Sequence, residues 1–176
     1  MYRHILLPTD GSRLAENAAA SGIALARALG ARVTAVHVLP HPPSSKLEAW
    51  AHSDRTYARR IDDAMEKRAH EYLETVREAA MLAGVPCECS LVHGDCVHRE
   101  ILEVAEDLHC DLSLVHGDSV HREILEVAED LHCDLIVMAS HGEKGDAISP
   151  QGSETVKAAM LGKVPVLVHH ARANGR

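Results

Sequence analysis

A segment of 23 residues occurs twice in tandem, and it constrains the fold more than any other feature of the chain. Residues 90–112 and 113–135 differ at one position, which is Cys96 in the first copy and Ser119 in the second. Each copy opens with a short apolar run, SLVHGD, and continues with apolar residues at helical spacing. One copy therefore predicts one strand followed by one helix. Two units are too few for a solenoid, which needs at least three stacked repeats.

The rest of the chain alternates strands and helices. Near-continuous aliphatic runs predict the strands 4–10, 31–40, 87–94, 135–140 and 164–170. Segments of helical periodicity predict the helices 12–29, 53–83 and 153–162, with a proline-containing loop at 41–51. Apolar strands of this kind are typical of a parallel sheet that helices cover on both faces. The sequence therefore predicts a single α/β domain over residues 1–176, built on a doubly wound open parallel sheet with five core strands.

The surplus copy has two placements. In the first, residues 111–118 add a sixth parallel strand at the sheet edge outside the third strand, and a helix over 119–132 crosses back to the fourth strand. In the second, one copy supplies both the strand and the helix of the unit, and the other copy loops out. The first placement is favoured, because looping out leaves an apolar strand and an apolar helix face in water.

Composition excludes several classes of function. The formal net charge is −8, and the chain has no Phe, one Trp and three Tyr. Single-stranded nucleic acid is usually bound by aromatic residues in a basic groove, so we expect no nucleic-acid partner. No stretch is long and apolar enough to span a membrane, and the start of the chain does not resemble a signal peptide. We therefore expect a cytoplasmic protein.

The cysteines and histidines do not predict a metal site. Five cysteines are an odd number, which argues against a disulfide framework. Cys87 and Cys89 lie two residues apart on a predicted strand and share one face, either as half of a metal site or as small buried hydrophobic residues. The second reading is favoured. Six of the 14 histidines come from the repeat, so their number reflects duplication.

The segment after the fourth predicted strand has the features of a phosphate-binding loop. It reads Met138-Ala139-Ser140-His141-Gly142, then nine residues, then Gly152-Ser153-Glu154-Thr155. A glycine lets the backbone approach a ligand closely, and the first N–H groups of a helix attract anions. Hydroxyl groups of Ser153 and Thr155 would add donors. The alternative is that Gly142 is a turn residue and Ser153 only an N-cap.

A second candidate segment, Pro8-Thr9-Asp10-Gly11-Ser12, ends the first predicted strand. An acidic residue at the end of a central strand can accept hydrogen bonds from a ligand hydroxyl or amine. The alternative is that Asp10 or Ser12 only caps the following helix.

Together these segments resemble the universal stress protein family. The markers are ILLPTDGS, AVHVLP, IVMASHG, a Gly-Ser pair before a helix, and a closing PVLVH strand. Nucleotide-binding members of the family carry G-x2-G-x9-G-[ST]. This chain keeps the spacing but has Ala139 in place of the first glycine, followed by Gly142, Gly152 and Ser153. Some members of the family lack this motif and do not bind nucleotide.

The resemblance implies a Rossmann-like protein of stress response or signalling that binds an adenine nucleotide. The nucleotide would be ATP or AMP, with or without Mg²⁺. The nucleotide would lie at the carboxyl edge of the sheet. Asp10 and the backbone around Pro8 and Val38 would hold the adenosine end, and Met138 and Ala139 would line the pocket. The phosphates would be surrounded by Gly142, Gly152, Ser153, Glu154 and Thr155. Because Glu143, Lys144 and Asp146 give the intervening loop a negative charge, we expect weaker binding than in better-matched members.

Two further functions stay open alongside nucleotide binding. The chain could be a nucleotide-independent dimeric interaction module of the same family, or a slow ATPase that uses His141. The ATPase is disfavoured, because Lys144 is the only basic residue that could contact the transferred phosphate and no carboxylate pair for Mg²⁺ is evident. We therefore expect no enzymatic activity. The resemblance also implies a homodimer formed through the last strand, over residues 164–169.

Overall fold

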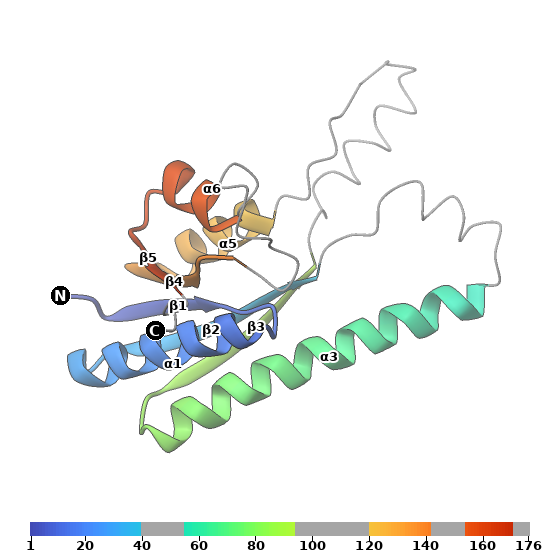
Figure 1. The fold of residues 1–176 in the computed structure, drawn as a ribbon, viewed down its shortest axis with the longest axis horizontal. Coiled ribbons are helices and arrows are strands. Elements are labelled where there is room, and N and C mark those ends of the chain that lie inside the picture. The colour runs from blue at the N-terminus through green and yellow to red at the C-terminus, as the bar shows by residue number, and fades with distance from the viewer. Residues whose placement is uncertain (40–54, 94–119, 142–153, 171–176) are drawn as a thin grey trace, which may run out of the picture.

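The computed structural model describes residues 1–39, 55–93, 120–141 and 154–170 (Figure 1). They form one five-stranded sheet in which all neighbouring strands are parallel and the order is β3-β2-β1-β4-β5. The strands are β1 His4–Pro8, β2 Arg32–Leu39, β3 Cys87–His93, β4 Leu135–Ala139 and β5 Val166–His169. This order confirms the predicted doubly wound α/β fold, with β1 at the centre.

In the described ranges, four helices cover the two faces of the sheet. They are α1 Arg13–Leu29, α3 Arg55–Leu82, α5 Val120–Asp130 and α6 Glu154–Leu161. Helices α1 and α3 lie on one face, and α5 and α6 lie on the other (Figure 1). The helices change faces because the winding from β1 to β3 runs in the opposite direction to the winding from β4 to β5. None of the helices in the described ranges is long and apolar enough to cross a membrane.

Local sequence explains where α1 begins and ends. Ser12 caps its first turn by accepting a hydrogen bond from the backbone N–H of Ala15 at 3.2 Å. Gly30 ends it in the left-handed conformation, with φ 65°, and its N–H returns to the carbonyls of the last turn. Small residues fill the face between these ends, so α1 packs close to the central strands.

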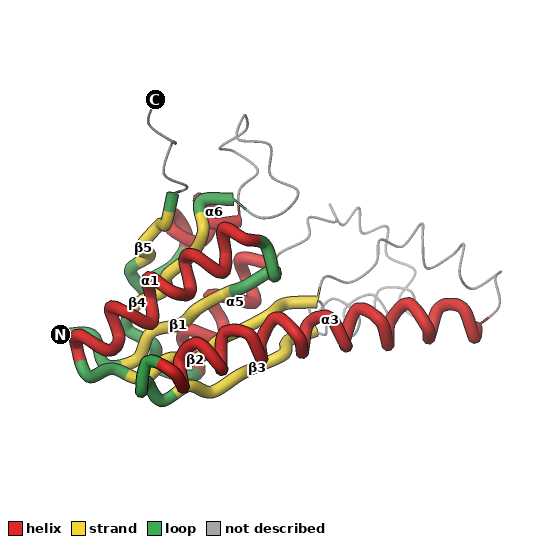
Figure 2. Tube along the Cα trace, turned by 60° about the horizontal axis from the view of Figure 1, so that its bottom comes forward, coloured by secondary structure: helices red, strands yellow, loops and turns green. Residues whose placement is uncertain are grey.

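Helix α3 is much longer than the sheet that it covers, as Figure 2 shows. Its 28 residues span about 42 Å at 1.5 Å per residue. Its fully buried residues, among those whose side chains are described, are Ala69, Leu73, Val76 and Ala80, all in the C-terminal half. These residues recur at helical spacing and face β2 and β3, so the C-terminal half of the helix contributes to the core.

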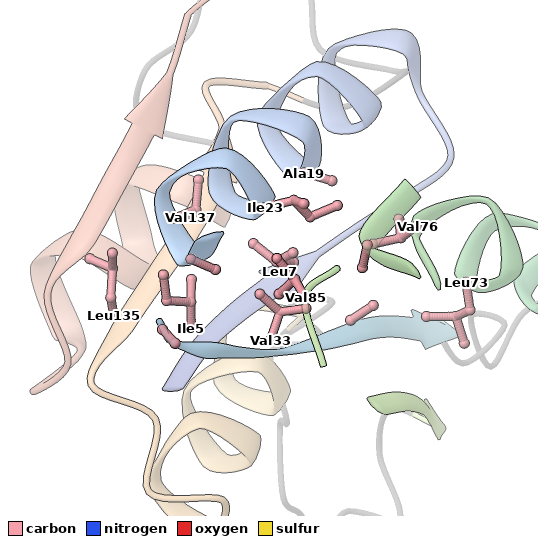
Figure 3. Close-up of a cluster of buried hydrophobic side chains, with 14 residues drawn as sticks. Ile5, Leu7, Ala19, Ile23, Val33, Leu73, Val76, Val85, Leu135 and Val137 are labelled. Carbon is pink, nitrogen blue, oxygen red and sulfur yellow. The ribbon is translucent and has the colours of Figure 1, made fainter. Parts of the chain in front are cut away.

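The two faces of the sheet carry separate hydrophobic clusters. The cluster under α1 and α3 includes Ile5, Leu7, Val33 and Val137 (Figure 3). The cluster under α5 and α6 includes Leu6, Val36, Val38, Ile124, Ile136, Met138 and Ala158. Alternate residues of the same strands supply the two clusters, which explains why these strands read as continuous apolar runs.

The described strand–helix unit combines both copies of the tandem repeat. Strand β3 ends with residues 90–93 of the first copy, whereas α5 comes from the second copy and leads into β4. The crossover of the second helix to the fourth strand agrees with the first placement. Among the described residues neither copy supplies both elements, and the second placement, in which one copy loops out, is not tested by them. The helix of the first copy and the strand of the second fall within 94–119, outside the described residues, so the sixth strand stays a prediction.

Candidate functional site

The strand order brings the predicted site residues to one edge of the sheet. Strands β1 and β4 are neighbours at the centre, and their connections leave toward opposite faces, which is where open α/β sheets bind ligands. The residues at or beside the carboxyl ends of the strands are Pro8, Asp10, Val38, Met138 and Ala139, with Glu154 and Thr155 at the start of α6. Gly142, Gly152 and Ser153 lie outside the described residues.

The loop after β1 is ordered by hydrogen bonds of its own. The Thr9 N–H donates to the Val36 carbonyl at 2.9 Å, and the Gly11 N–H donates to the Thr9 hydroxyl at 3.2 Å. The Ser12 N–H donates to Oδ1 of Asp10 at 3.0 Å. The capping role of Ser12 is therefore confirmed, and the Asp10 carboxylate also supports the turn. Asp10 nevertheless stays half-buried and lies directly beyond the central strand.

Two residues that the sequence analysis missed hold this loop from the α1 and α3 face. The ring of Tyr72 lies so close to Gly11, which has φ 75°, that a Cβ there would be 2.3 Å from a ring carbon. His37 has its ring centroid 5.6 Å from that of Tyr72, and its Nδ1 lies 2.7 Å from the Thr9 carbonyl oxygen. Burial lowers the pKa of His37, although the Thr9 carbonyl and Asp10 oppose that shift. The position of Tyr72 beside Leu73 on the buried side of α3 was the available sequence signal.

Met138 and Ala139 point to opposite faces of the sheet. Met138 belongs to the cluster with Val38 under α5 and α6. Ala139 packs with Ala15 and Ala18 of α1 and is 8% exposed. The methyl group that replaces the first glycine of the family pattern is therefore accommodated against α1. The extra methyl group takes up space on that face of the sheet.

The start of α6 is tied directly to the end of β4. The Thr155 hydroxyl donates to the Ala139 carbonyl at 2.6 Å, and Thr155 is buried. This hydroxyl was expected to be a phosphate donor, and the structure instead uses it to fix the helix. Thr155 could therefore contribute only its backbone N–H to an anion site. This N–H lies in the first turn of α6, where N–H groups have no partner within the helix.

The side chain of Glu154 is also engaged within the protein. Its Oε2 accepts a hydrogen bond from the His121 N–H and lies 2.7 Å from His121 Nδ1, and its Oε1 accepts from Lys157 Nζ at 2.8 Å. Burial alone would raise the pKa of Glu154, but the bonds from Lys157 and His121 outweigh it and lower the pKa. His121 was missed, because nothing in the sequence joins residues 33 positions apart. Helix α5 of the second repeat copy is thereby linked to the start of α6.

The described residues contain no group of three or more His, Cys, Asp or Glu side chains that could hold a metal ion. His141, the candidate for acid–base chemistry, has its Nδ1 3.0 Å from the hydroxyl of Ser140. This edge of the sheet combines three features. It presents an acidic loop after β1, an apolar wall on β2 and β4, and the N-terminus of α6, which carries a partial positive charge.

Comparison with known proteins matches the family model described as "Universal stress protein family" to residues 1–115 and again to residues 113–170. The two matches meet at the junction of the tandem copies. A comparison with curated proteins finds no match.

Solved structures of the same fold cover almost the whole chain. The hypothetical protein MJ0577 is 22% identical with a TM-score of 0.68, and 99% of each chain is covered. A universal stress protein in complex with cAMP is 19% identical with a TM-score of 0.59, covering 96% of this chain and 97% of that one. The universal stress protein from Archaeoglobus fulgidus in complex with dAMP is 18% identical with a TM-score of 0.59, covering 96% and 98%.

Proposed function

The chain belongs to the universal stress protein family, and we propose that it binds an adenine nucleotide, ATP or AMP, at the carboxyl edge of its sheet. The observation that carries this proposal is the hydrogen bond from Thr155 to the Ala139 carbonyl. It fixes the N-terminus of α6 beside the end of β4 and next to the loop that carries Asp10. The N-terminus of α6, which would attract a phosphate, and Asp10, which would accept ligand hydroxyl groups, belong to the same edge of the sheet.

The residues present fit the two ends of a nucleotide. The backbone around Pro8 and Val38 would hold the adenosine end, and Met138 would line the pocket at the rim of the cluster in which both Val38 and Met138 are more than 90% buried. Asp10 would accept hydrogen bonds from the ribose hydroxyls, and the loop that carries it is held by Tyr72 and His37. The first-turn N–H groups of α6 would meet the phosphates, together with Gly142, Gly152 and Ser153. Two structures of the same fold, which contain cAMP and dAMP, support an adenine ligand.

Calorimetric titration with ATP and with AMP tests the proposal. We expect saturable binding that Asp10→Ala weakens by about tenfold or more, the loss of a hydrogen bond to a charged group being worth about 1.5–3 kcal/mol. Asp130→Ala removes the same charge from the exposed end of α5 and serves as the matched control. Absence of heat with both nucleotides would refute the proposal, and so would equal losses in the two variants.

A second variant separates the phosphate end from the adenosine end. Thr155→Val keeps the shape of the side chain but removes the bond that positions α6. Affinity for ATP should then fall more than affinity for adenosine, because only ATP reaches the helix N-terminus. Equal losses for the two ligands would place the phosphates elsewhere.

We propose further that two copies of the chain pair through the edge strand at residues 164–169. Strand β5 ends the sheet, and Leu167 on it is 46% exposed. Met160 and Leu161 at the end of α6 are 79% and 67% exposed. Light scattering should give a dimer at micromolar concentration and a monomer for Leu167→Lys. Met81→Lys, a substitution at the exposed end of α3, should stay dimeric. A monomeric wild-type protein would refute this pairing.

One observation favours the nucleotide-independent interaction module as a second candidate. The Glu154 carboxylate and the Thr155 hydroxyl, both expected near the phosphates, are bonded within the protein. A dimer that gives no heat with ATP or AMP would establish this second function in place of the first.

A further inference from the structure

Two thiols lie together on the edge strand β3, away from the nucleotide edge. Cys87 and Cys89 pair with Val33 and Ala35 of β2, in the amino half of β3. Residues two apart on a strand face the same side. Both side chains here face α3: Cys87 packs against the hydrophobic cluster under that helix, and Cys89 Sγ donates to the Leu73 carbonyl at 3.6 Å. Cys87 Sγ donates to the Glu88 carbonyl at 3.6 Å.

From this geometry we propose that Cys87 and Cys89 form a two-coordinate site for a soft d¹⁰ cation, of which Cu(I) is the biological example. Thiolate sulfur is the ligand that such ions prefer. Cys89 is exposed and Cys87 is half-buried, so an ion can enter from solvent and then be partly covered. Arg77, 58% exposed on the facing turn of α3, lies beside the two sulfurs and is paired with Glu74 at 2.6 Å, so the two charges act on the site in opposite directions.

The spacing suits a bridging ion better than a disulfide or a zinc ion. Residues two apart on a strand have their Cα atoms about 6.6 Å apart, near the upper limit for a disulfide, and their Cβ atoms point the same way. An ion between two sulfurs, each with a metal–sulfur bond of roughly 2.3 Å, separates them by roughly 4.6 Å. This sulfur–sulfur distance is longer than a contact between two thiols and shorter than the distance between the two Cα atoms. Structural zinc needs four ligands, and no group of three is present among the described residues.

Binding exchanges protons for the ion without oxidation or reduction. Two S–H bonds break, two S–Cu bonds form, and two protons leave to solvent, so the bound unit carries a net charge of −1. Burial, together with the neighbouring thiol, raises the pKa of Cys87 to about 12, and burial raises the pKa of Cys89. Both thiols are therefore protonated at neutral pH, and the apparent affinity should rise by about a hundredfold per pH unit, since two protons are displaced.

Anaerobic competition between the protein and bicinchoninate for Cu(I) tests the site. The reference is the double variant Cys96→Ser and Cys110→Ser, which retains Cys87, Cys89 and the buried Cys133. It should bind one ion per chain with the two-proton pH dependence. Adding Cys89→Ser should weaken binding by at least a hundredfold and reduce the dependence to about tenfold per pH unit.

The matched control adds Cys133→Ser to the same reference and should keep the high-affinity ion. Circular dichroism of each variant establishes that β3 remains folded, so that a loss of binding reports the ligand. Binding that survives Cys89→Ser in a folded protein would overturn the proposal. So would a one-proton dependence in the reference protein.

Discussion

The tandem copies predict that a cavity in α5 will cost less stability than burial alone indicates. Ile124 is 3% exposed and belongs to the cluster that joins α5 to the sheet. Truncation of a buried isoleucine to alanine normally lowers the free energy of unfolding by about 2–5 kcal/mol. Residues 97–107, however, have the same sequence as α5. They can take its place against the sheet when α5 is damaged.

The cost of that exchange sets a ceiling on the destabilisation. The two helical sequences are preceded by different residues, Ser119 before Val120 and Cys96 before Val97. Serine is a strong N-cap, and its loss costs about 0.5–2 kcal/mol. The change in loop length adds only about 0.6 kcal/mol per doubling. Ile124→Ala should therefore cost about 1–2 kcal/mol, below the usual range for a buried isoleucine.

Urea unfolding followed by helical circular dichroism measures these values in a double-mutant cycle. Ile101→Ala alone should have almost no effect, whereas the double variant with Ile124→Ala should lose the full 2–5 kcal/mol. Adding Cys96→Ser to Ile124→Ala should restore about 1 kcal/mol. Ile136→Ala in β4, outside the repeat and fully buried in the same cluster, is the control that should show the full loss.

One pattern of results would refute the exchange. If Ile124→Ala is as costly as Ile136→Ala, and Ile101→Ala adds nothing to it, the second copy alone fills the helix position. The first copy would then make no contribution to the stability of the sheet.

Three further predictions follow from single positions. Gly11→Ala should cost about 1–3 kcal/mol of unfolding free energy, and Gly84→Ala only about 1 kcal/mol. Both glycines have positive φ, but of the two only Gly11 lies against a ring, that of Tyr72. Equal costs in urea unfolding would argue against the Tyr72 contact. The pKa of His37 is lowered in the folded chain from its ordinary value of 6.5, which favours the neutral imidazole. The free energy of folding that His37 contributes is therefore complete above pH 6.5 and is lost as the pH falls toward the pKa of the folded state. The melting temperature should therefore drop less between pH 7 and 5 in His37→Asn, whose amide still donates to the Thr9 carbonyl, and an unchanged drop would contradict this. Ala139→Gly should destabilise the protein by about 0.5–1 kcal/mol, because the methyl group packs on α1. For the same reason it should not tighten ATP binding in calorimetry. A clear gain in affinity would place the methyl group in the ligand pocket.

Local patterns in the sequence predict the existence of each described element, and they fail at the ends of strands. The first strand was predicted to reach Asp10, and β1 ends at Pro8. Beyond Pro8 the backbone bonds to the side chains of Thr9 and Asp10, so the chain turns. The periodicity of apolar residues does not reveal where side chains compete with the strand for backbone hydrogen bonds. The start of α1 was predicted correctly at Ser12, because a cap depends on residues only three apart.

The candidate site could be predicted only in part, because its decisive contacts join distant residues. The family spacing located Asp10 and the start of α6, but Thr155 bonds to a carbonyl 16 residues away and Glu154 to a histidine 33 residues away. Nothing in the local sequence distinguishes a side chain that faces a ligand from one that ties two elements together. The repeat had the same difficulty. Two copies with one sequence give identical periodicity, so only the structure shows which helix crosses to β4.

Two deletions ask whether the repeat adds anything to the fold. Removing residues 94–116 joins His93 at the end of β3 to Gly117, which leaves Gly117, Asp118 and Ser119 before α5. Three residues are an ordinary length for a strand–helix loop. The bonds of His121 to Glu154 and the residues of the proposed nucleotide site lie outside the deletion. If residues 94–116 loop out, stability should change by less than about 0.5 kcal/mol, as for a surface change, and ATP affinity should be retained, whereas loss of a sixth strand should cost more.

Removing residues 97–119 instead gives a chain that differs from the first deletion only by Cys96 in place of Ser119 before α5. It should be less stable by about 1 kcal/mol, because serine is the better N-cap residue. In both shortened chains Ile124→Ala should cost the full 2–5 kcal/mol, since no second helix can replace α5. A first deletion that unfolds or loses ATP binding would show that residues 94–116 are part of the working structure. The tandem copy would then be required for function.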